Sequence, residues 1–325
     1  MNINEIAKLA GVSRTTVSRY LNDGYVSEEK KEQIRQVIEE TGYRPSAQAQ
    51  TLRTRKTQLV GVILPKISSD TVSRMVAGIS DVLHENGYQL LLGNTNNSVE
   101  EELNYLKLFK ERQVDGILFI ATIFTRRHKK LLQECQVPVV ILGQRLAGFS
   151  CVYHDDYHAA LDITRRLIKD AKHPAYIGVT TKDEAAGLNR KLGFEAALKE
   201  KGLKCPPEYM AEGDFSMEAG RERMAELLKA APDLDSVFCA TDSIAAGAMV
   251  SLWEAGKRIP EDVRICGLGD TQTARLVRPK LATVHFYYKT SGQEAAAMLI
   301  ERMEAESSIN KELKMGYEVI ENDSL

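Results

Sequence analysis

The chain has 325 residues, 43% of them hydrophobic, and a formal net charge of −2. This length exceeds that of one ordinary domain and predicts two or three domains. Residues 1–58 hold more Lys and Arg than Asp and Glu, whereas the remainder of the chain is acidic. A basic head on an acidic body is typical of a small nucleic-acid-binding module attached to a larger domain.

The cysteines and the first residues indicate in which compartment the protein resides. The five cysteines are odd in number and include no Cys-x-x-Cys pair. This pattern argues against a disulfide framework or a zinc site and favours a reducing compartment. The first residues do not resemble a secretory signal, and no apolar run is long enough to span a membrane. We therefore expect a cytoplasmic protein without a membrane partner.

Residues 1–44 predict a small head of three helices. Apolar side chains recur at helical spacing on both sides of Gly11, which falls where the chain must turn sharply. Ser13 can cap the second helix, and Ser27 and Gly42 mark the start and end of a third. The expected apolar positions are Ile6, Leu9 and Ala10 in the first helix, and Val17, Tyr20 and Leu21 in the second.

The outward face of the second helix carries polar side chains suited to DNA. Arg14, Thr15, Ser18 and Arg19 bear guanidinium or hydroxyl groups, which fit phosphate oxygens and base edges in a major groove. A solvated polar helix face is the plainer alternative. The turn glycine, the cap and the apolar spacing together favour a helix-turn-helix whose second helix reads DNA.

Residues 45–58 predict a linker. Pro45 interrupts the helical pattern, and the residues after it have helical propensity but almost no apolar face to bury. A segment this short is not a stable helix by itself, so we expect it to be flexible in the free protein. A second hypothesis is a hinge that folds on DNA and inserts Leu52 as a wedge between base pairs.

From residue 59 onward, short apolar runs alternate with amphipathic helical stretches. This alternation predicts parallel sheets in doubly wound α/β layers, and two successive sets predict two lobes. We expect lobe 1 at about 59–156 and 287–313, and lobe 2 at about 157–284 and 316–325. In open α/β sheets the ligand lies outside the carboxyl ends of the strands, so the two lobes predict a cleft between them.

Several short motifs occur along the chain in a fixed order. They are Ile6-Ala7-x-x-Ala10-Gly11-Val12-Ser13, Thr16-Val17-Ser18-Arg19, Asp115-Gly116-Ile117-Leu118, Arg190-x-x-Gly193-Phe194, Thr241-Asp242-x-x-Ala245-x-Gly247-Ala248 and Pro279-x-Leu281-x-Thr283-Val284. In this order the chain resembles the lac/galactose repressor (LacI/GalR) family of bacterial transcription regulators. The resemblance implies a helix-turn-helix head plus an α/β two-lobed effector domain like the type I periplasmic binding proteins. Its crossovers would lie near Asp156, His285 and Met315.

The resemblance also implies a homodimer on a near-palindromic double-stranded DNA operator. Arg14 and Thr15 would choose bases, Arg19 would contact a further base or phosphate, and Leu52 would enter the minor groove. The chain ends at Leu325 without the C-terminal heptad helix of tetrameric members, so we expect a dimer. The residues assigned to DNA binding are Ser13, Arg14, Thr15, Thr16, Ser18, Arg19, Asn22, Leu52 and Arg53.

For the effector site, the resemblance places Arg190 in the cleft and Phe215 at the aromatic on which family ligands stack. Members that bind free sugars often carry Asp where this chain has Gly269, and some also carry one near Gly143. Lys66 would join Arg190 in a cationic pocket, although a solvated loop lysine is the alternative. The chain resembles the sucrose and trehalose operon repressors, which predicts a sugar phosphate or a neutral disaccharide such as sucrose. The assigned effector residues are Lys66, Ser68, Ser69, Arg190, Phe215, Thr241 and Asp270.

The predicted function is repression of a carbohydrate-utilisation operon, relieved when the effector binds. Corepression or activation by the same family, and a sugar sensor that does not bind DNA, are the alternatives. We expect no enzymatic activity and no cofactor, because the sequence contains no Gly-rich phosphate loop and no nucleophile elbow. The run His154-Asp155-Asp156-Tyr157-His158 has metal-ligand residue types but fits a helix cap at a crossover better, so we expect no metal.

Overall fold

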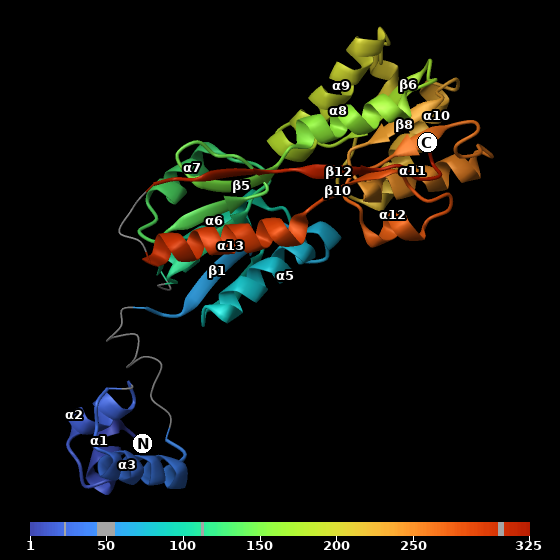
Figure 1. The fold of residues 1–325 in the computed structure, drawn as a ribbon. Helices are drawn as coiled ribbons and strands as arrows, with labels where there is room; N and C mark the ends of the chain where they lie inside the picture. Colours follow the sequence, from blue (N-terminus) through green and yellow to red (C-terminus); the bar gives the residue numbers. More distant parts are fainter. Residues whose placement is uncertain (23, 44–55, 112–113, 305–308) are drawn as a thin grey trace. The chain divides into compact units, whose positions relative to one another are not determined.

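The computed structural model describes residues 1–22, 24–43, 56–111, 114–304 and 309–325 (Figure 1). These residues form two compact units, Met1–Thr57 and Gln58–Leu325. The predicted DNA contacts Leu52 and Arg53, and most of the predicted linker, lie outside the described residues. None of the described helices is long and apolar enough to cross a membrane.

The N-terminal unit packs its described helices around one small core. They are α1 (Ile3–Leu9), α2 (Arg14–Tyr20) and α3 (Glu28–Thr41). Ile6, Val17 and Ile34, one from each helix, are fully shielded from solvent. Gly11 joins α1 to α2 at a φ of +63°, and Gly42 ends α3 at +62°. Glycine is favoured at both positions because other residues rarely adopt this conformation.

One local prediction for the head was wrong. Leu9 is 58% exposed, and the buried residues of this face are Ile6, Ala7 and Ala10. Successive helix residues are about 100° apart, so this face centres between Ile6 and Ala7 and turns Leu9 outward. Ser27 is the N-cap residue of α3, as predicted, although its side chain makes no capping hydrogen bond. In α1 the helical spacing of the apolar residues was predicted correctly, but the centre of the apolar face was not.

In the larger unit, lobe 1 is built on a parallel sheet with the strand order β11-β5-β4-β3-β1-β2. Val62 packs on the side of this sheet covered by α5 and α13, and Ile63 packs on the opposite side with α6 and α7. Each buried strand is therefore apolar on both faces. The elements are β1 (Leu59–Leu64), α5 (Asp70–Glu85), β2 (Gln89–Asn94), α6 (Val99–Glu111), β3 (Gly116–Ile120), α7 (Arg126–Gln133), β4 (Val139–Leu142), β5 (Ser150–His154), α13 (Tyr288–Glu304) and β11 (Glu312–Met315).

Lobe 2 repeats this architecture on a parallel sheet with the order β7-β6-β8-β9. Phe194 of α9 packs with Tyr176 and Phe238 on one face, and Met249 of α11 packs with Ile177 on the other. The elements are α8 (Asp156–Leu167), β6 (Pro174–Gly178), the π-helix η1 (Glu184–Asn189), α9 (Arg190–Lys201), the 3₁₀-helix η2 (Pro207–Tyr209), β7 (Met210–Glu212), α10 (Met217–Ala230), β8 (Ser236–Cys239), α11 (Asp242–Glu254), β9 (Arg264–Cys266) and α12 (Gln272–Leu276).

The chain passes between the lobes from β5 to α8, from β10 (Thr283–Phe286) to α13, and from β11 to β12 (Tyr317–Ile320). These connections lie beside Asp156, His285 and Met315. Strands β10 and β12 pair with each other in antiparallel orientation. The labels β10 and β12 near the centre of Figure 1 mark this pair.

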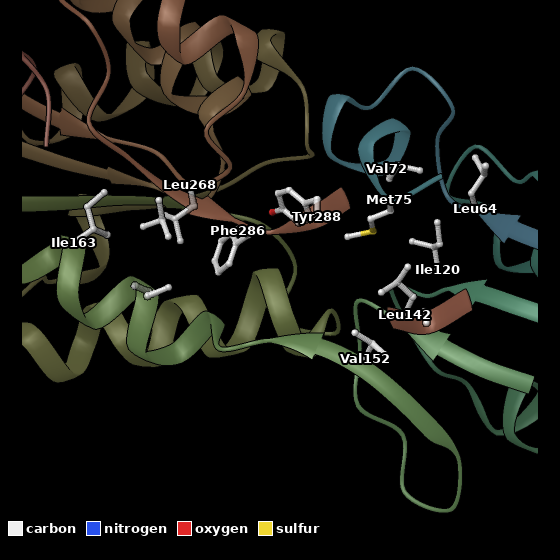
Figure 2. Packing of buried hydrophobic residues seen from close by; sticks show 14 of the residues in the cluster. Leu64, Val72, Met75, Ile120, Leu142, Val152, Ile163, Leu268, Phe286 and Tyr288 are labelled. Atoms are coloured by element: carbon white, nitrogen blue, oxygen red, sulfur yellow. The ribbon is translucent and has the colours of Figure 1, made fainter. Parts of the chain in front are cut away.

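One apolar cluster continues from lobe 1 into lobe 2 along these connections (Figure 2). Leu64 and Ile120 belong to its lobe 1 end, and Leu268 belongs to its lobe 2 end. Phe286 and Tyr288 lie between them, on the second connection. The lobes thus share part of their core, and any movement of one lobe against the other must repack these two aromatic rings.

Helices α10 and α11 approach closely because Gly247 lacks a side chain. A Cβ atom on Gly247 would lie 1.8 Å from the carbonyl oxygen of Met217, the first residue of α10. Because this oxygen belongs to the backbone, α10 would have to move to make room for a Cβ atom on Gly247. Gly247 therefore sets the position of the start of α10 relative to α11.

We expect Gly247→Ala to lower the free energy of unfolding by about 1–3 kcal/mol, because the added methyl group overpacks this contact. Thermal denaturation of the full chain measures the effect. Gly316→Ala is the matched control, because a Cβ atom at Gly316 meets nothing within 4 Å. Equal losses in the two variants would contradict the close-approach explanation.

Candidate DNA-binding helix and effector cavity

Helix α2 is the predicted reading helix, and Ser13 fixes where it begins. The Ser13 Oγ accepts a hydrogen bond from the backbone N–H of Thr16 at 3.1 Å and lies 2.8 Å from Thr16 Oγ1. Val17 is fully buried and anchors the helix to the core of the head. The start of α2 is therefore capped as predicted, with the two hydroxyl groups bonded to each other.

The remaining predicted DNA contacts of α2 are accessible. Arg14, Thr15 and Arg19 are exposed, and Ser18 is partly exposed. The side-chain amide of Asn22 donates to the carbonyl oxygen of Ser18 just beyond the end of the helix. This surface offers guanidinium and hydroxyl groups of the kinds that contact phosphates and base edges.

Tyr25 is a further candidate that was not among the predicted contacts. It is 91% exposed in the loop between α2 and α3. An exposed aromatic ring with a hydroxyl group can stack or donate a hydrogen bond at an interface. The signal in the sequence was an aromatic residue in the loop next to the reading helix.

A cavity of about 420 Å³ lies between the two lobes of the larger unit. Its lining comes from segments that directly follow strands. Lys66, Ala121 and Gly143 follow β1, β3 and β4, whereas Asp183 and Thr241 follow β6 and β8. The cavity therefore lies outside the carboxyl ends of the strands, where open α/β sheets bind ligands. Its volume falls within the range of about 300–1,000 Å³ that is typical of small-molecule sites.

Asp270 does not line this cavity, although it was predicted to contact the effector. Its Oδ2 lies 2.6 Å from Arg275 Nη2 and 2.8 Å from His285 Nδ1. Gly269 and Asp270 have φ values of 139° and 46°, and this turn directs the carboxylate toward α12 and β10. The other predicted residues line the cavity together, namely Lys66, Ser68, Ser69, Arg190, Phe215 and Thr241.

Two of the lining hydroxyl groups also cap helices. Ser69 Oγ accepts from the N–H of Val72 at the start of α5, and Thr241 Oγ1 accepts from the N–H of Ile244 at the start of α11. The Thr241 hydroxyl retains its own O–H donor for a ligand, whereas the Ser69 hydroxyl also lies 3.0 Å from Thr71 Oγ1. Phe215 is 38% exposed, so an apolar ring is available beside these donors.

Arg190 is buried, and its charge is matched by Asp156. Nε and Nη2 both lie 2.7 Å from Asp156 Oδ1, and Nη1 donates to the carbonyl oxygen of Ala240 at 2.5 Å. The guanidinium also lies 5.3 Å from the centre of the Phe286 ring. Burial by itself lowers the pKa of Arg190, but the Asp156 charge raises that pKa above its ordinary value. The guanidinium is therefore charged and paired.

Two further buried carboxyl groups line the cavity. Asp183 Oδ1 accepts from Gln144 Nε2 at 2.7 Å, which joins lobe 2 to lobe 1 across the cleft. Asp242 accepts from the N–H of Thr271 at 2.8 Å and from Thr283 Oγ1 at 2.5 Å. Burial raises the pKa of both carboxyl groups.

Lys66 and Arg190, the two cations of the predicted pocket, both line the cavity, and Asp156 pairs with Arg190. Asp156 balances the charge of Arg190, and Asp183 and Asp242 add acceptor groups to the lining. A phosphate group entering the cavity would face these carboxyl groups. Sugar hydroxyls can instead donate hydrogen bonds to them.

The run from His154 to His158 forms a cap and a crossover. His154 is buried beside the rings of Phe286 and Tyr288. His158 lies 2.8 Å from Asp155 Oδ1, and Asp155 caps α8. Among the residues that the structure describes, no group of three or more His, Cys, Asp or Glu side chains is placed to hold a metal ion.

Comparison with known proteins assigns both units to one family. Residues 2–46 match the model of bacterial regulatory proteins of the lacI family. Residues 57–320 match the model of periplasmic binding proteins and the sugar-binding domain of the LacI family. The chain therefore belongs to the LacI family, a class of DNA-binding regulators with a sugar-binding domain. The predicted family and fold class are confirmed.

Individual relatives cover nearly the whole chain. The sucrose operon repressor of Staphylococcus xylosus is 34% identical over 295 residues, which are 90% of this chain and 91% of that protein. The structure of the transcriptional regulator CelR in complex with cellobiose has a TM-score of 0.77 at 29% identity, covering 100% of this chain and 99% of that one. The lac repressor dimer bound to operator and the anti-inducer ONPF has a TM-score of 0.90 at 20% identity, with 100% and 98% covered, and shares the fold.

We expect Asp156→Ala to lower the free energy of unfolding by about 3–5 kcal/mol, because the Arg190 guanidinium then stays buried without an opposite charge. Urea-induced unfolding of the full chain measures the loss. The double variant with Asp156→Ala and Arg190→Met removes both charges and should recover part of it.

The exposed pair between Arg221 and Glu254 supplies the control, since both side chains are more than half exposed. Glu254→Ala should lower the free energy of unfolding by less than about 1 kcal/mol. If the losses of Asp156→Ala and Arg190→Met simply add in the double variant, the two residues do not stabilise each other.

Proposed function

We propose that this protein is a homodimeric transcription repressor of a carbohydrate-utilisation operon, released from its operator by a neutral disaccharide. The observation that carries this proposal is a cavity lined by paired charges, hydroxyl groups and an accessible aromatic ring, on the same chain as a capped helix-turn-helix. Its site of action is the cytoplasm, where the chromosome lies. We propose no enzymatic activity, consistent with relatives that are regulators.

On DNA, each α2 of the dimer occupies a major groove of a near-palindromic operator. Arg14 and Thr15 read bases, and Arg19 contacts a further base or phosphate. The DNA backbone next to these bases is held by Ser13, Thr16, Ser18 and Asn22. The roles assigned to Leu52 and Arg53 remain predictions from the sequence.

We expect Arg14→Ala to weaken binding to a specific site by about 1–3 kcal/mol and to relax the preference at one base position. A preferred site is first selected from a random duplex library with the full chain. Fluorescence anisotropy then measures the affinity of each variant at several salt concentrations.

Arg35→Ala is the control, because it also removes one cation from the head but does so outside the reading helix. Arg35 lies on α3 and pairs with Glu32. This control should bind the selected site with nearly the affinity of the original protein. If both variants weaken binding equally and keep the same base preference, Arg14 does not read a base.

The preference for a neutral sugar over a sugar phosphate rests on the balance of charge in the cavity. Asp156 forms an ion pair with the guanidinium of Arg190, and Asp183 is a buried hydrogen-bond acceptor. Two similar proteins are named for disaccharides, the sucrose operon repressor and the CelR–cellobiose complex. The ring of Phe215 offers the apolar face on which a sugar ring stacks.

We expect sucrose or cellobiose to stabilise the full chain in a thermal-shift assay, by about 2.7 kcal/mol at one hundred times the dissociation constant. Glucose 6-phosphate and sucrose 6-phosphate should give little shift. Phe215→Ala should remove most of the shift, whereas Lys66→Ala, at an exposed lining residue, should leave it unchanged. A shift with phosphorylated sugars alone would support the cationic pocket and overturn the neutral effector.

The sign of regulation follows from which conformation the sugar prefers. A sugar that binds the DNA-free conformation more tightly lowers operator affinity by the same factor. The anisotropy assay repeated with the stabilising sugar therefore distinguishes induction from corepression. If the protein binds sugar but shows no salt-dependent DNA binding, it is instead a sugar sensor that does not bind DNA.

A further inference from the structure

The effector cavity contains a buried histidine with an unsatisfied nitrogen. His154, the last residue of β5, lines the cavity and is 7% exposed. Its Nε2 is shielded from solvent and has no hydrogen-bond partner. A buried polar atom left without a partner destabilises a protein by about 1–3 kcal/mol. A site that retains such an atom calls for an explanation.

The His154 ring is held by aromatic residues of another connection. Its centre lies 5.2 Å from that of Phe286 and 4.9 Å from that of Tyr288, with an interplanar angle of 70° to Tyr288. Figure 2 shows Phe286 and Tyr288 at the middle of the cluster that joins the lobes. His154 therefore links the first connection between the lobes to the second.

The imidazole is neutral under ordinary conditions. Burial lowers the pKa of His154 to about 4, although the nearby Asp156 charge acts in the opposite direction. Arg190 adds to the lowering, and Tyr288 packs against the ring with its own pKa raised to about 12 by burial. A neutral imidazole has one donor and one acceptor nitrogen, so it suits a hydroxyl group, which can act as either.

We infer that His154 is a specificity-determining residue of the effector cavity, and that its Nε2 hydrogen-bonds to one hydroxyl group of the bound sugar. This inference rests on the proposed sugar effector. Because Nε2 is shielded in the present arrangement, the sugar reaches it only when the lobes or the Tyr288 ring shift. The bond therefore forms in the shifted arrangement and gives the sugar a higher affinity for that arrangement.

The test compares His154→Leu with the original full chain by isothermal titration with sucrose, cellobiose and their monodeoxy derivatives. We expect the leucine variant to bind the parent sugar about 10-fold more weakly, equivalent to about 1.4 kcal/mol. The original chain should discriminate against one monodeoxy derivative, and His154→Leu should lose that discrimination. His154→Gln, which keeps donor and acceptor groups, should restore part of the affinity.

Two controls separate recognition from folding. His154→Leu without sugar should be at least as thermally stable as the original chain, because it removes an unsatisfied nitrogen. His158→Ala, at an exposed histidine of the same segment, should leave sugar affinity unchanged. A large loss of thermal stability in His154→Leu would assign the ring a structural role and overturn the inference.

The outcomes distinguish this inference from the proposed function. If the original chain binds a disaccharide and His154→Leu binds it equally well with the same discrimination, the His154 assignment is wrong and the sugar effector stands. If the original chain binds neither disaccharide, both the neutral effector and the His154 assignment fail.

Discussion

The buried ion pair between Arg190 and Asp156 is the interaction on which the effector cavity depends. It ties the first turn of α9 to the first turn of α8, and Arg190 Nη1 extends the contact to Ala240 at the end of β8. A guanidinium can be buried here because a carboxylate, a carbonyl oxygen and the Phe286 ring replace its water. Arg190 is also the C-cap residue of the π-helix that leads from Asp183 into α9.

This pair also limits which ligands the cavity suits. Once Asp156 is paired with Arg190, the lining retains Asp183, Asp242 and several hydroxyl groups, and its balance shifts toward hydrogen-bond acceptors. A ligand with many hydroxyl groups supplies the donors that such a lining needs. Discrimination among sugars then comes from where each hydroxyl meets a buried polar partner, because an unmatched partner is costly.

Local rules predicted the head better than the cavity. Gly11 and Ser13 could be assigned because a left-handed turn and a helix cap depend on neighbouring residues alone. The error at Leu9 arose because a seven-residue helix leaves the phase of its apolar face poorly defined. In the cavity, the motif placed Arg190 correctly. Its partner Asp156 was not predicted, because it lies 34 residues away in the sequence. Asp270 was expected in the lining, but its carboxylate pairs with Arg275 and His285, contacts that its neighbours in the sequence do not reveal.

Three features make occupancy of the cavity and the arrangement of the lobes depend on each other. Gln144 bonds to Asp183 across the cleft, so a ligand that competes for Asp183 weakens a contact between the lobes. Phe286 and Tyr288 lie where β10 connects to α13, within the apolar cluster that the lobes share, so a movement of one lobe against the other disturbs their packing. His154 packs against both rings, and its buried Nε2 has no hydrogen-bond partner among the described residues. A ligand that satisfies this nitrogen stabilises a different packing of the same rings, which is the differential affinity that a regulatory switch requires.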